Sequence, residues 1–220
     1  MTEQDSARGA APMRALGTTR VATLADGIFA IALTLLVLDL HAQHAATQTQ
    51  LLSQLRGLAP QFAAFVISFA VLGVFWYGHH MELHFIVRSD RVHLGITLAF
   101  LLTIACVPFS ASLLGRNYQF PLAATIYGVN LCLAGMVRYA HWVYATAGYR
   151  LVDPSTDPEM IRYVRRIFLL VPMLYLVAAA LAWLSTIVAF VCFALIPLLY
   201  VKPARPTRHL TSLRGISSSP

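Results

Sequence analysis

One aspartate inside an otherwise apolar stretch is the first feature of this chain that suggests chemistry. Residues 20–40 read RVATLADGIFAIALTLLVLDL, with Arg20 and Asp39 near the ends and Asp26 inside. A helix of about twenty apolar residues spans the hydrocarbon core of a bilayer. An ionisable side chain at membrane depth is costly and is kept where it finds a partner or faces water. Asp26 is therefore a candidate functional residue.

A second group of polar side chains occupies residues 79–84, which read HHMELH. His80 and His84 are four residues apart and share one face of a helix, as a pair of metal ligands would. Their order differs from His-Glu-x-x-His, which places a general base beside zinc, and His93 and His141 stand alone in the sequence. We expect no metal and no other cofactor, and a membrane metalloenzyme centred on His80 and His84 is an alternative.

The composition indicates an integral membrane protein. Hydrophobic residues make up 58% of the 220 residues and charged residues only 11%, which lies outside the range of soluble globular domains. The three cysteines lie in apolar runs without a CxxC spacing, so we expect buried small side chains and no disulfide framework.

The basic residues alternate from loop to loop. The net charge is +7, and nearly all of it falls in the two terminal segments and in every second loop between apolar runs. This asymmetry follows the positive-inside rule and predicts that both termini are cytoplasmic. A nucleic-acid surface would not alternate in this way, so no nucleic acid is expected as a partner.

The apolar runs predict an all-α membrane protein with six transmembrane helices in residues 20–201. Residues 1–19 and 202–220 are rich in small and polar residues and are expected to be disordered cytoplasmic tails. The sixth helix is short, and a break near residues 183–186 separates it from the fifth. The expected spans are residues 20–40, 61–84, 92–114, 121–145, and two within 158–201.

Several local signals refine this topology. Residues 41–58 are polar and predict an external loop with a short helical turn near residues 51–55. Pro108 removes a backbone donor and predicts a kink in the third helix, and Asp157 is placed to cap a helix that begins at Pro158. We expect Arg138 to reach the cytoplasmic surface along its aliphatic stem, in preference to a functional charge in the membrane.

The spacing within the first span divides its helix into two faces. Asp26 points to one side and must find donors on neighbouring helices. The spacing alone favours an opposite stripe that faces lipid. That stripe, with Thr34 on its flank, consists of Arg20, Leu24, Gly27, Ile31, Leu35 and Leu38.

The same residues resemble the signature of the transmembrane protein 175 family of potassium channels, bacterial branch. That signature is Arg, three residues, Phe-Ser-Asp-Gly, then Phe-Ala-Ile and Thr-Leu-Leu. Here it reads Arg20, LADG at residues 24–27, FAI at 29–31 and TLL at 34–36. Leu24 and Ala25 depart from the usual Phe and Ser.

The resemblance implies that the first helix lines a pore in a homotetramer. Ile31, Leu35 and Leu38 would form hydrophobic rings, with Ile31 as the gate, and Thr34 would contribute to selectivity. It also implies a polar network in which His79 or His80 helps to hold the Asp26 side of the first helix. The expected members of this network are Arg20, Asp26, Trp76, His79 and His80.

The outer end of the first helix carries a further candidate residue. Asp39 near the outer mouth would concentrate cations by its field, and an exposed aspartate without a role is equally consistent with the sequence. Residues 146–150, TAGYR, resemble the filter of common potassium channels, in which carbonyl oxygens replace the ion's water shell. They lack the closing glycine and lie beside cytoplasmic arginines, so we expect no filter there.

The expected function is a potassium-permeable cation channel, not an enzyme. The signature occurs once in the chain, so the resemblance implies a bacterial protein of the inner membrane that must form a homotetramer, with the lipid bilayer as its surroundings and K⁺ as the permeant ion. Selectivity for K⁺ over Na⁺ would be modest. The alternative is a proton-coupled secondary transporter that uses Asp26 and His79 or His80 as a relay.

Overall fold

A computed structural model describes residues 20–200, and all the secondary-structure elements in that range are helices, apart from one isolated β-bridge. The expected tails, residues 1–19 and 202–220, lie outside the described residues. Within residues 20–200, five helical stretches are long and apolar enough to cross a membrane. These are Arg20–Asp39, Ala59–Phe85 (α3), Arg91–Arg116 (α4 and α5), Pro121–Tyr149 (α6 and η2) and Pro158–Leu181 (α7).

The expected sixth helix is present as a short apolar helix. α8 covers Thr186–Leu195 and continues as a 3-10 helix, η3, over Ile196–Tyr200. The Ser185 side chain accepts a hydrogen bond from the backbone N–H of Val188 (3.4 Å) and so caps the start of α8. At about 1.5 Å per residue, this helix is shorter than the hydrocarbon core of about 30 Å. A sixth crossing therefore stays a prediction.

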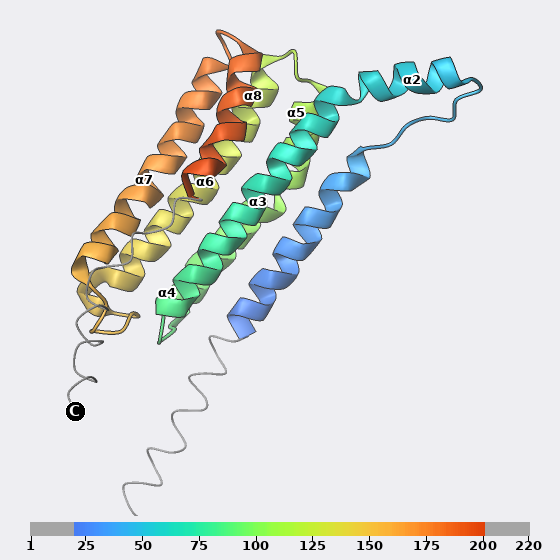
Figure 1. Cartoon of the computed structure of the whole chain (residues 1–220). Helices are drawn as coiled ribbons and strands as arrows, with labels where there is room; N and C mark the ends of the chain where they lie inside the picture. Colours follow the sequence, from blue (N-terminus) through green and yellow to red (C-terminus); the bar gives the residue numbers. More distant parts are fainter. Residues whose placement is uncertain (1–19, 201–220) are drawn as a thin grey trace, which may run out of the picture.

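The helices form a bundle in which α6 (Pro121–Thr146) lies centrally and the first helix lies at the edge (Figure 1). α6 packs closely on α7 because two glycines remove the side chains that would separate them. A Cβ at Gly128 would lie 2.7 Å from the Ala179 Cβ, and one at Gly135 would lie 2.8 Å from the Pro172 Cβ. The first helix packs against α3 and the α4–α5 segment, and its outward face has no neighbour among residues 20–200.

Caps and breaks explain where the elements begin and end. The Asp90 side chain accepts from the His93 backbone and starts α4 (Arg91–Ala105). The predicted kink is confirmed as a break at Cys106, after which α5 (Val107–Arg116) begins with Pro108 in its first turn. The predicted cap at Asp157 is also confirmed, because its side chain accepts from the Glu159 backbone N–H (2.8 Å).

The loop over residues 41–58 is more ordered than expected. In place of a short turn near residues 51–55, the chain forms a ten-residue helix, α2 (Gln48–Gly57), capped by Thr47. The cap accepts a hydrogen bond from the Gln50 backbone N–H at 3.2 Å. A Thr cap followed by leucines at helical spacing was the signal in the sequence for this helix.

Candidate pore helix and its polar supports

The first helix has one packed face and one open face. Its packed face is almost fully buried and consists of Ala25, Phe29, Ala32 and Leu36, each 3% exposed or less. The Phe29 ring lies 6.0 Å from the Phe100 ring of α4 and 6.5 Å from the His79 ring of α3, measured between centroids. This packing fixes how the helix is rotated, and therefore which residues it turns away from its own subunit.

The residues predicted to form rings lie on the open face. Ile31 is 60% exposed, Leu35 42% and Leu38 67%. Leu24 and Gly27 continue the same open stripe toward the start of the helix. These side chains are therefore free to contact lipid, water or another protein chain.

Thr34 lies on this open face with its hydroxyl hydrogen directed to its own helix. Its Oγ1 donates to the backbone oxygen of Ile31 (2.9 Å) or Ala30 (3.0 Å). A hydroxyl has one hydrogen and two acceptor lone pairs. The oxygen therefore keeps the capacity to face a cation.

Asp26 finds its donor on α3, but the donor is an indole. Trp76 Nε1 donates to Asp26 Oδ1 at 2.8 Å. Of the two histidines expected to help hold this side of the first helix, His79 contacts the helix through the Phe29 ring and has its Nδ1 near Glu82. His80 lies against the Trp76 ring, at 5.7 Å between centroids. Arg20 lies exposed at the start of the helix, and it forms no ion pair with any residue in the described range 20–200.

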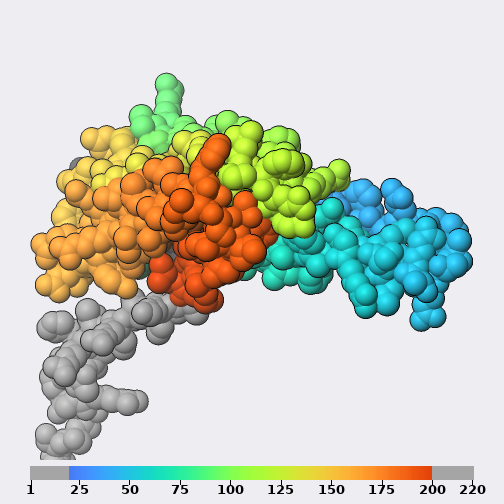
Figure 2. Space-filling model, turned by 90° about the horizontal axis from the view of Figure 1, so that it is seen from above, coloured from blue at the N-terminus to red at the C-terminus, as the bar shows by residue number. Residues whose placement is uncertain are grey.

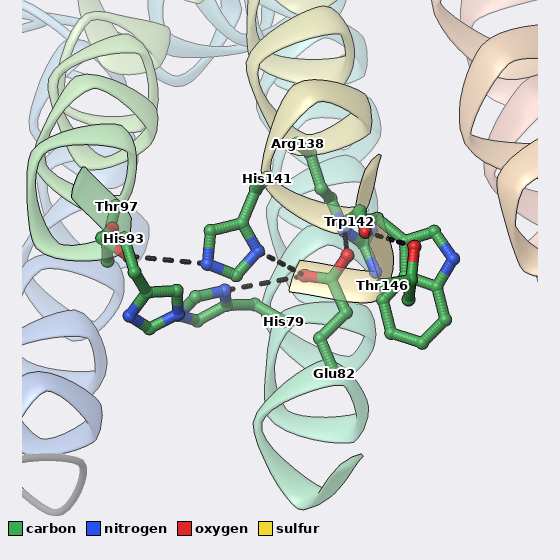
Figure 3. A network of polar contacts seen from close by, with 8 residues as sticks. All are labelled: His79, Glu82, His93, Thr97, Arg138, His141, Trp142 and Thr146. Carbon is green, nitrogen blue, oxygen red and sulfur yellow. Dashed lines mark hydrogen bonds and ion pairs between the residues drawn. The ribbon is translucent and has the colours of Figure 1, made fainter. Parts of the chain in front are cut away.

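A buried network surrounds Glu82 near the end of α3 (Figure 3). Glu82 and Arg138 of α6 are each 2% exposed, and Arg138 Nε lies 3.2 Å from Glu82 Oε1. The Arg138 guanidinium also lies over the Phe168 ring of α7, 4.1 Å from its centroid. The expectation that Arg138 reaches the membrane surface is therefore wrong, since a buried carboxylate on a neighbouring helix offers it a closer partner.

Histidines from three helices complete this network. His79 Nδ1 and His141 Nδ1 lie 3.7 Å and 3.9 Å from Glu82 Oε2. His93 at the start of α4 lies beside His141, with ring centroids 4.6 Å apart. Thr97 lies 3.4 Å from His141 Nε2 and donates to the His93 backbone oxygen. The network thus ties α3, α4 and α6 together at one end of the bundle.

Sequence reasoning missed that Glu82 is the centre of this network. The available signal was the presence of single opposite charges, Glu82 and Arg138, in two apolar spans, because isolated charges at membrane depth are normally paired. The relay expected for a transporter is not favoured, because Asp26 accepts a hydrogen bond from Trp76 whereas His79 faces Glu82.

The end of the first helix at Asp39 carries an ion pair and lies beside a hollow. Arg116 of α5 donates to Asp39 Oδ1 at 2.9 Å. The side chains are 50% and 31% exposed, respectively, so solvent screens the pair. Beside it, a hollow is lined on its apolar side by Leu36, Leu40 and Phe65. The field of Asp39 at this end is therefore partly neutralised within the subunit.

The residues that resemble a carbonyl filter form the turn that ends α6. Ala147–Tyr149 is a short 3-10 segment, with Gly148 at φ +58° and Tyr149 at φ +54°.

Of the two histidines in the alternative metal site, His80 lies against the Trp76 ring, and His84 lies against the Phe85 ring at 5.7 Å between centroids.

These features define a class: a helical membrane protein whose first helix has one packed face, one open apolar face and polar contacts with the neighbouring helix. The family described as endosomal/lysosomal potassium channel TMEM175 matches residues 20–108. A potassium channel of Streptomyces collinus is 31% identical over 82% of this chain and 90% of its own length. A potassium channel of Chamaesiphon minutus is 35% identical over 81% of this chain and 91% of its own length.

Solved structures agree with these relatives. The crystal structure of a TMEM175 homologue from Chamaesiphon minutus, described as a lysosomal potassium-selective channel, is 28% identical, covers 84% of this chain and 96% of its own, and superposes with a TM-score of 0.75. A variant of the potassium channel MtTMEM175 shares the fold at 18% identity and a TM-score of 0.55. The chain belongs to the TMEM175 family of potassium channels, which is a channel family and not an enzyme family.

Proposed function

We propose that this chain forms a potassium-permeable cation channel as a homotetramer, with the first helix of each subunit around the pore. The observation that carries the proposal is the open apolar stripe on a helix whose other face is packed. Ile31, Leu35 and Leu38 are 42–67% exposed in the single chain. Closed rotational symmetry is usual for homo-oligomers, and four copies of such a stripe can surround an axis.

Hydrophobic rings would provide the gate in this channel. A narrow apolar constriction dewets and blocks ions without any charged group. Ile31 would form the tightest ring, and the helices must move apart to readmit water. Thr34, with free oxygen lone pairs, would then offer ligands to a partly hydrated ion. Selectivity for K⁺ over Na⁺ from such a lining would be modest.

The contacts between the first helix and the neighbouring helices would hold the gate in one orientation. The Trp76–Asp26 hydrogen bond and the Phe29–His79 ring contact join the first helix to α3. α3 is in turn joined to α6 through the Glu82–Arg138 ion pair. A rotation of the first helix would break these contacts, so they favour one presentation of the stripe.

The membrane and its sidedness belong to the same proposal. The positive-inside pattern supports two cytoplasmic termini. Two relatives described as potassium channels come from Streptomyces collinus and Chamaesiphon minutus, and they support a location in a bacterial cell membrane.

Flux measurements on purified protein in liposomes test this function. Ile31→Asn places a hydrogen-bonding side chain in the proposed constriction and should increase K⁺ flux several-fold, because it admits water. Ile187→Asn on α8 is a matched control, since Ile187 is 73% exposed on another helix. Its flux should equal that of the natural sequence.

Two results would contradict the proposal. Unchanged flux in Ile31→Asn, with intact tetramers, would remove Ile31 as the gate. Saturable, pH-coupled transport in place of fast K⁺ flux would favour a secondary transporter.

A further inference from the structure

α7 (Pro158–Leu181) lies at the edge of the bundle, on the side opposite the first helix (Figure 1). Seen from above in Figure 2, the same part of the chain forms the edge of the molecule that lies farthest from α2. The inner face of α7 is buried and includes Phe168, Val171 and Tyr175, which are 6%, 1% and 1% exposed. The opposite face of this membrane-length helix therefore points away from the protein.

The first turns of this outward face carry arginines. Arg162, Arg165 and Arg166 are all exposed. Residues four apart share a helix face, so the Arg162 and Arg166 guanidinium groups can reach the same anion. Glu159 lies 4.0 Å from Arg162, but these side chains are 83% and 66% exposed and solvent screens the pair. No ion pair within residues 20–200 engages Arg165 or Arg166.

An apolar stripe continues the same face beyond the arginines. Leu170, Met173 and Val177 follow Arg166 at helical spacing and are 54%, 37% and 53% exposed. Residues 167–200 contain no Asp, Glu, Lys or Arg, so charge ends at Arg166. Tyr163, beside the arginines, is 48% exposed, and tyrosines are enriched where a helix meets the membrane surface. The arginines thus lie at the depth of lipid headgroups and the stripe at the depth of acyl chains.

We infer that the outward face of α7 is a binding site for an anionic phospholipid. The lipid phosphate lies between Arg162 and Arg166, because a guanidinium binds phosphate oxygens through two parallel N–H groups. One acyl chain follows the stripe toward Val177. Basic residues next to a membrane span attract anionic lipids, and a single lipid molecule engages both parts of this face. A free phosphate would engage the arginines alone.

Two other arginines close to this end of the bundle provide a matched control. The Arg150 guanidinium lies over the Tyr144 ring, 4.7 Å from its centroid. Arg88 lies in the loop between α3 and α4, where its backbone N–H donates to the Leu151 oxygen at 3.2 Å. Both are exposed and both lie in loops, so neither continues into an outward apolar stripe of its own helix.

Lipid binding by the purified full chain in detergent, counted by native mass spectrometry, tests this site. The probes are dioleoylphosphatidylglycerol, which is anionic, and dioleoylphosphatidylcholine, which has no net charge. An arginine near the membrane surface favours an anionic lipid by about fivefold, so Arg162→Gln/Arg166→Gln should weaken phosphatidylglycerol binding by about 25-fold. Its phosphatidylcholine binding should not change. Arg88→Gln/Arg150→Gln removes the same charge and should bind phosphatidylglycerol as the natural sequence does.

Two results would overturn the lipid site. Equal loss of phosphatidylglycerol binding in the two double variants would mean that only the overall charge attracts the lipid. Displacement of the lipid by excess inorganic phosphate would mean that the arginines bind a free anion, since phosphate has no acyl chain to compete for the stripe. Binding is counted without an ion gradient, so its outcome is independent of whether the protein conducts K⁺.

Discussion

At the scale of single residues, the buried pair of Glu82 and Arg138 is the most consequential feature. Both side chains are 2% exposed, and their ionised groups are 3.2 Å apart. Removing two charges from water offsets most of their attraction, so such a pair adds little stability over two apolar side chains. Removing one partner is costly because the other charge stays buried.

Arg138→Met should therefore destabilise the protein more than the double variant Glu82→Gln/Arg138→Met. The expected loss for the single change is about 3–5 kcal/mol, since a carboxylate is left buried without its guanidinium. The midpoint of thermal unfolding in detergent reports the order of the variants. The control is Arg162→Met, because Arg162 is 66% exposed and 4.0 Å from an exposed Glu159. A double variant less stable than Arg138→Met would contradict the pairing.

Asp90 should make stability depend on pH in the acid range. Its Oδ1 accepts from the His93 backbone N–H (2.8 Å) and its Oδ2 from the Tyr144 hydroxyl (2.6 Å). These two hydrogen bonds hold the pKa of the Asp90 carboxyl below its ordinary value, and the bond from the His93 backbone has the larger effect. The lowered folded-state pKa stabilises the protein at pH values above the unfolded-state pKa, which is near 3.9. This stabilisation is lost as pH falls through the folded-state pKa.

The substitution Asp90→Asn tests this dependence. The variant should be less stable than the natural sequence at pH 6, because the charged acceptor is gone. The difference between the two should shrink only as pH falls below the unfolded-state pKa and through the lowered folded-state pKa, where the natural carboxyl becomes protonated. Unfolding midpoints measured across this range check it, and two parallel curves would show that Asp90 does not supply the effect.

Two acidic residues, Asp26 and Glu82, show where sequence reasoning succeeded and where it stopped. The spacing correctly required a donor for Asp26 on another helix, but the donor was Trp76 and not a histidine. Residues 76, 79 and 80 lie within about one turn of α3. Only the rotation of α3 against the first helix and α6 decides which of them meets Asp26 and which meets Glu82, and a single sequence does not encode that rotation locally.

At the scale of elements, the contact between α6 and α7 depends on glycine. Gly128→Ala would place a Cβ 2.7 Å from the Ala179 Cβ and 3.0 Å from the Tyr175 backbone oxygen. The helices would have to separate, at a cost of about 1–3 kcal/mol. Gly73→Ala in α3 is the matched control, because nothing lies within 4 Å of its Cβ position.

The control should be neutral or slightly stabilising, since Ala is a better helix former than Gly. Unfolding midpoints of the two variants in the same detergent make the comparison. Equal midpoints would mean that α6 and α7 are not as closely packed as the structure describes.

The membrane-length elements were predictable because hydropathy and length decide them. α3 was expected over residues 61–84 and spans Ala59–Phe85, and the break expected near residues 183–186 contains the Ser185 cap. α2 was underestimated, because no hydropathy signal separates a ten-residue polar helix from a loop. Its cap at Thr47 was the better guide.

At the scale of the whole molecule, the described part of the chain leaves one face of a membrane-length helix without a packing partner. The first helix buries one face to 3% or less and leaves the other open, and α2 extends from its outer end (Figure 2). The stripe was visible in the sequence, but lipid and a pore both fit its periodicity. Family membership, and not periodicity, favours the pore, so the arrangement of four copies stays a proposal.

Thr34 provides a test of ion selectivity in this assembly. In the proposed tetramer, four Thr34 hydroxyl oxygens surround the axis next to the ring of four Ile31 side chains. Thr34→Val keeps the shape but removes the oxygen, and it should lower the ratio of K⁺ to Na⁺ flux without changing assembly. Thr34→Ser keeps the oxygen and the hydrogen bond to its own helix, so its ratio should stay near that of the natural sequence.

Paired K⁺ and Na⁺ gradients in liposomes measure this ratio, and light scattering confirms that each variant is assembled. Because the Thr34 hydrogen already binds the Ile31 or Ala30 backbone oxygen, its oxygen can act only as an acceptor toward the pore. The effect should therefore be specific to cations and absent from water permeability, which the apolar rings control. An unchanged flux ratio in Thr34→Val would place selectivity elsewhere along the pore.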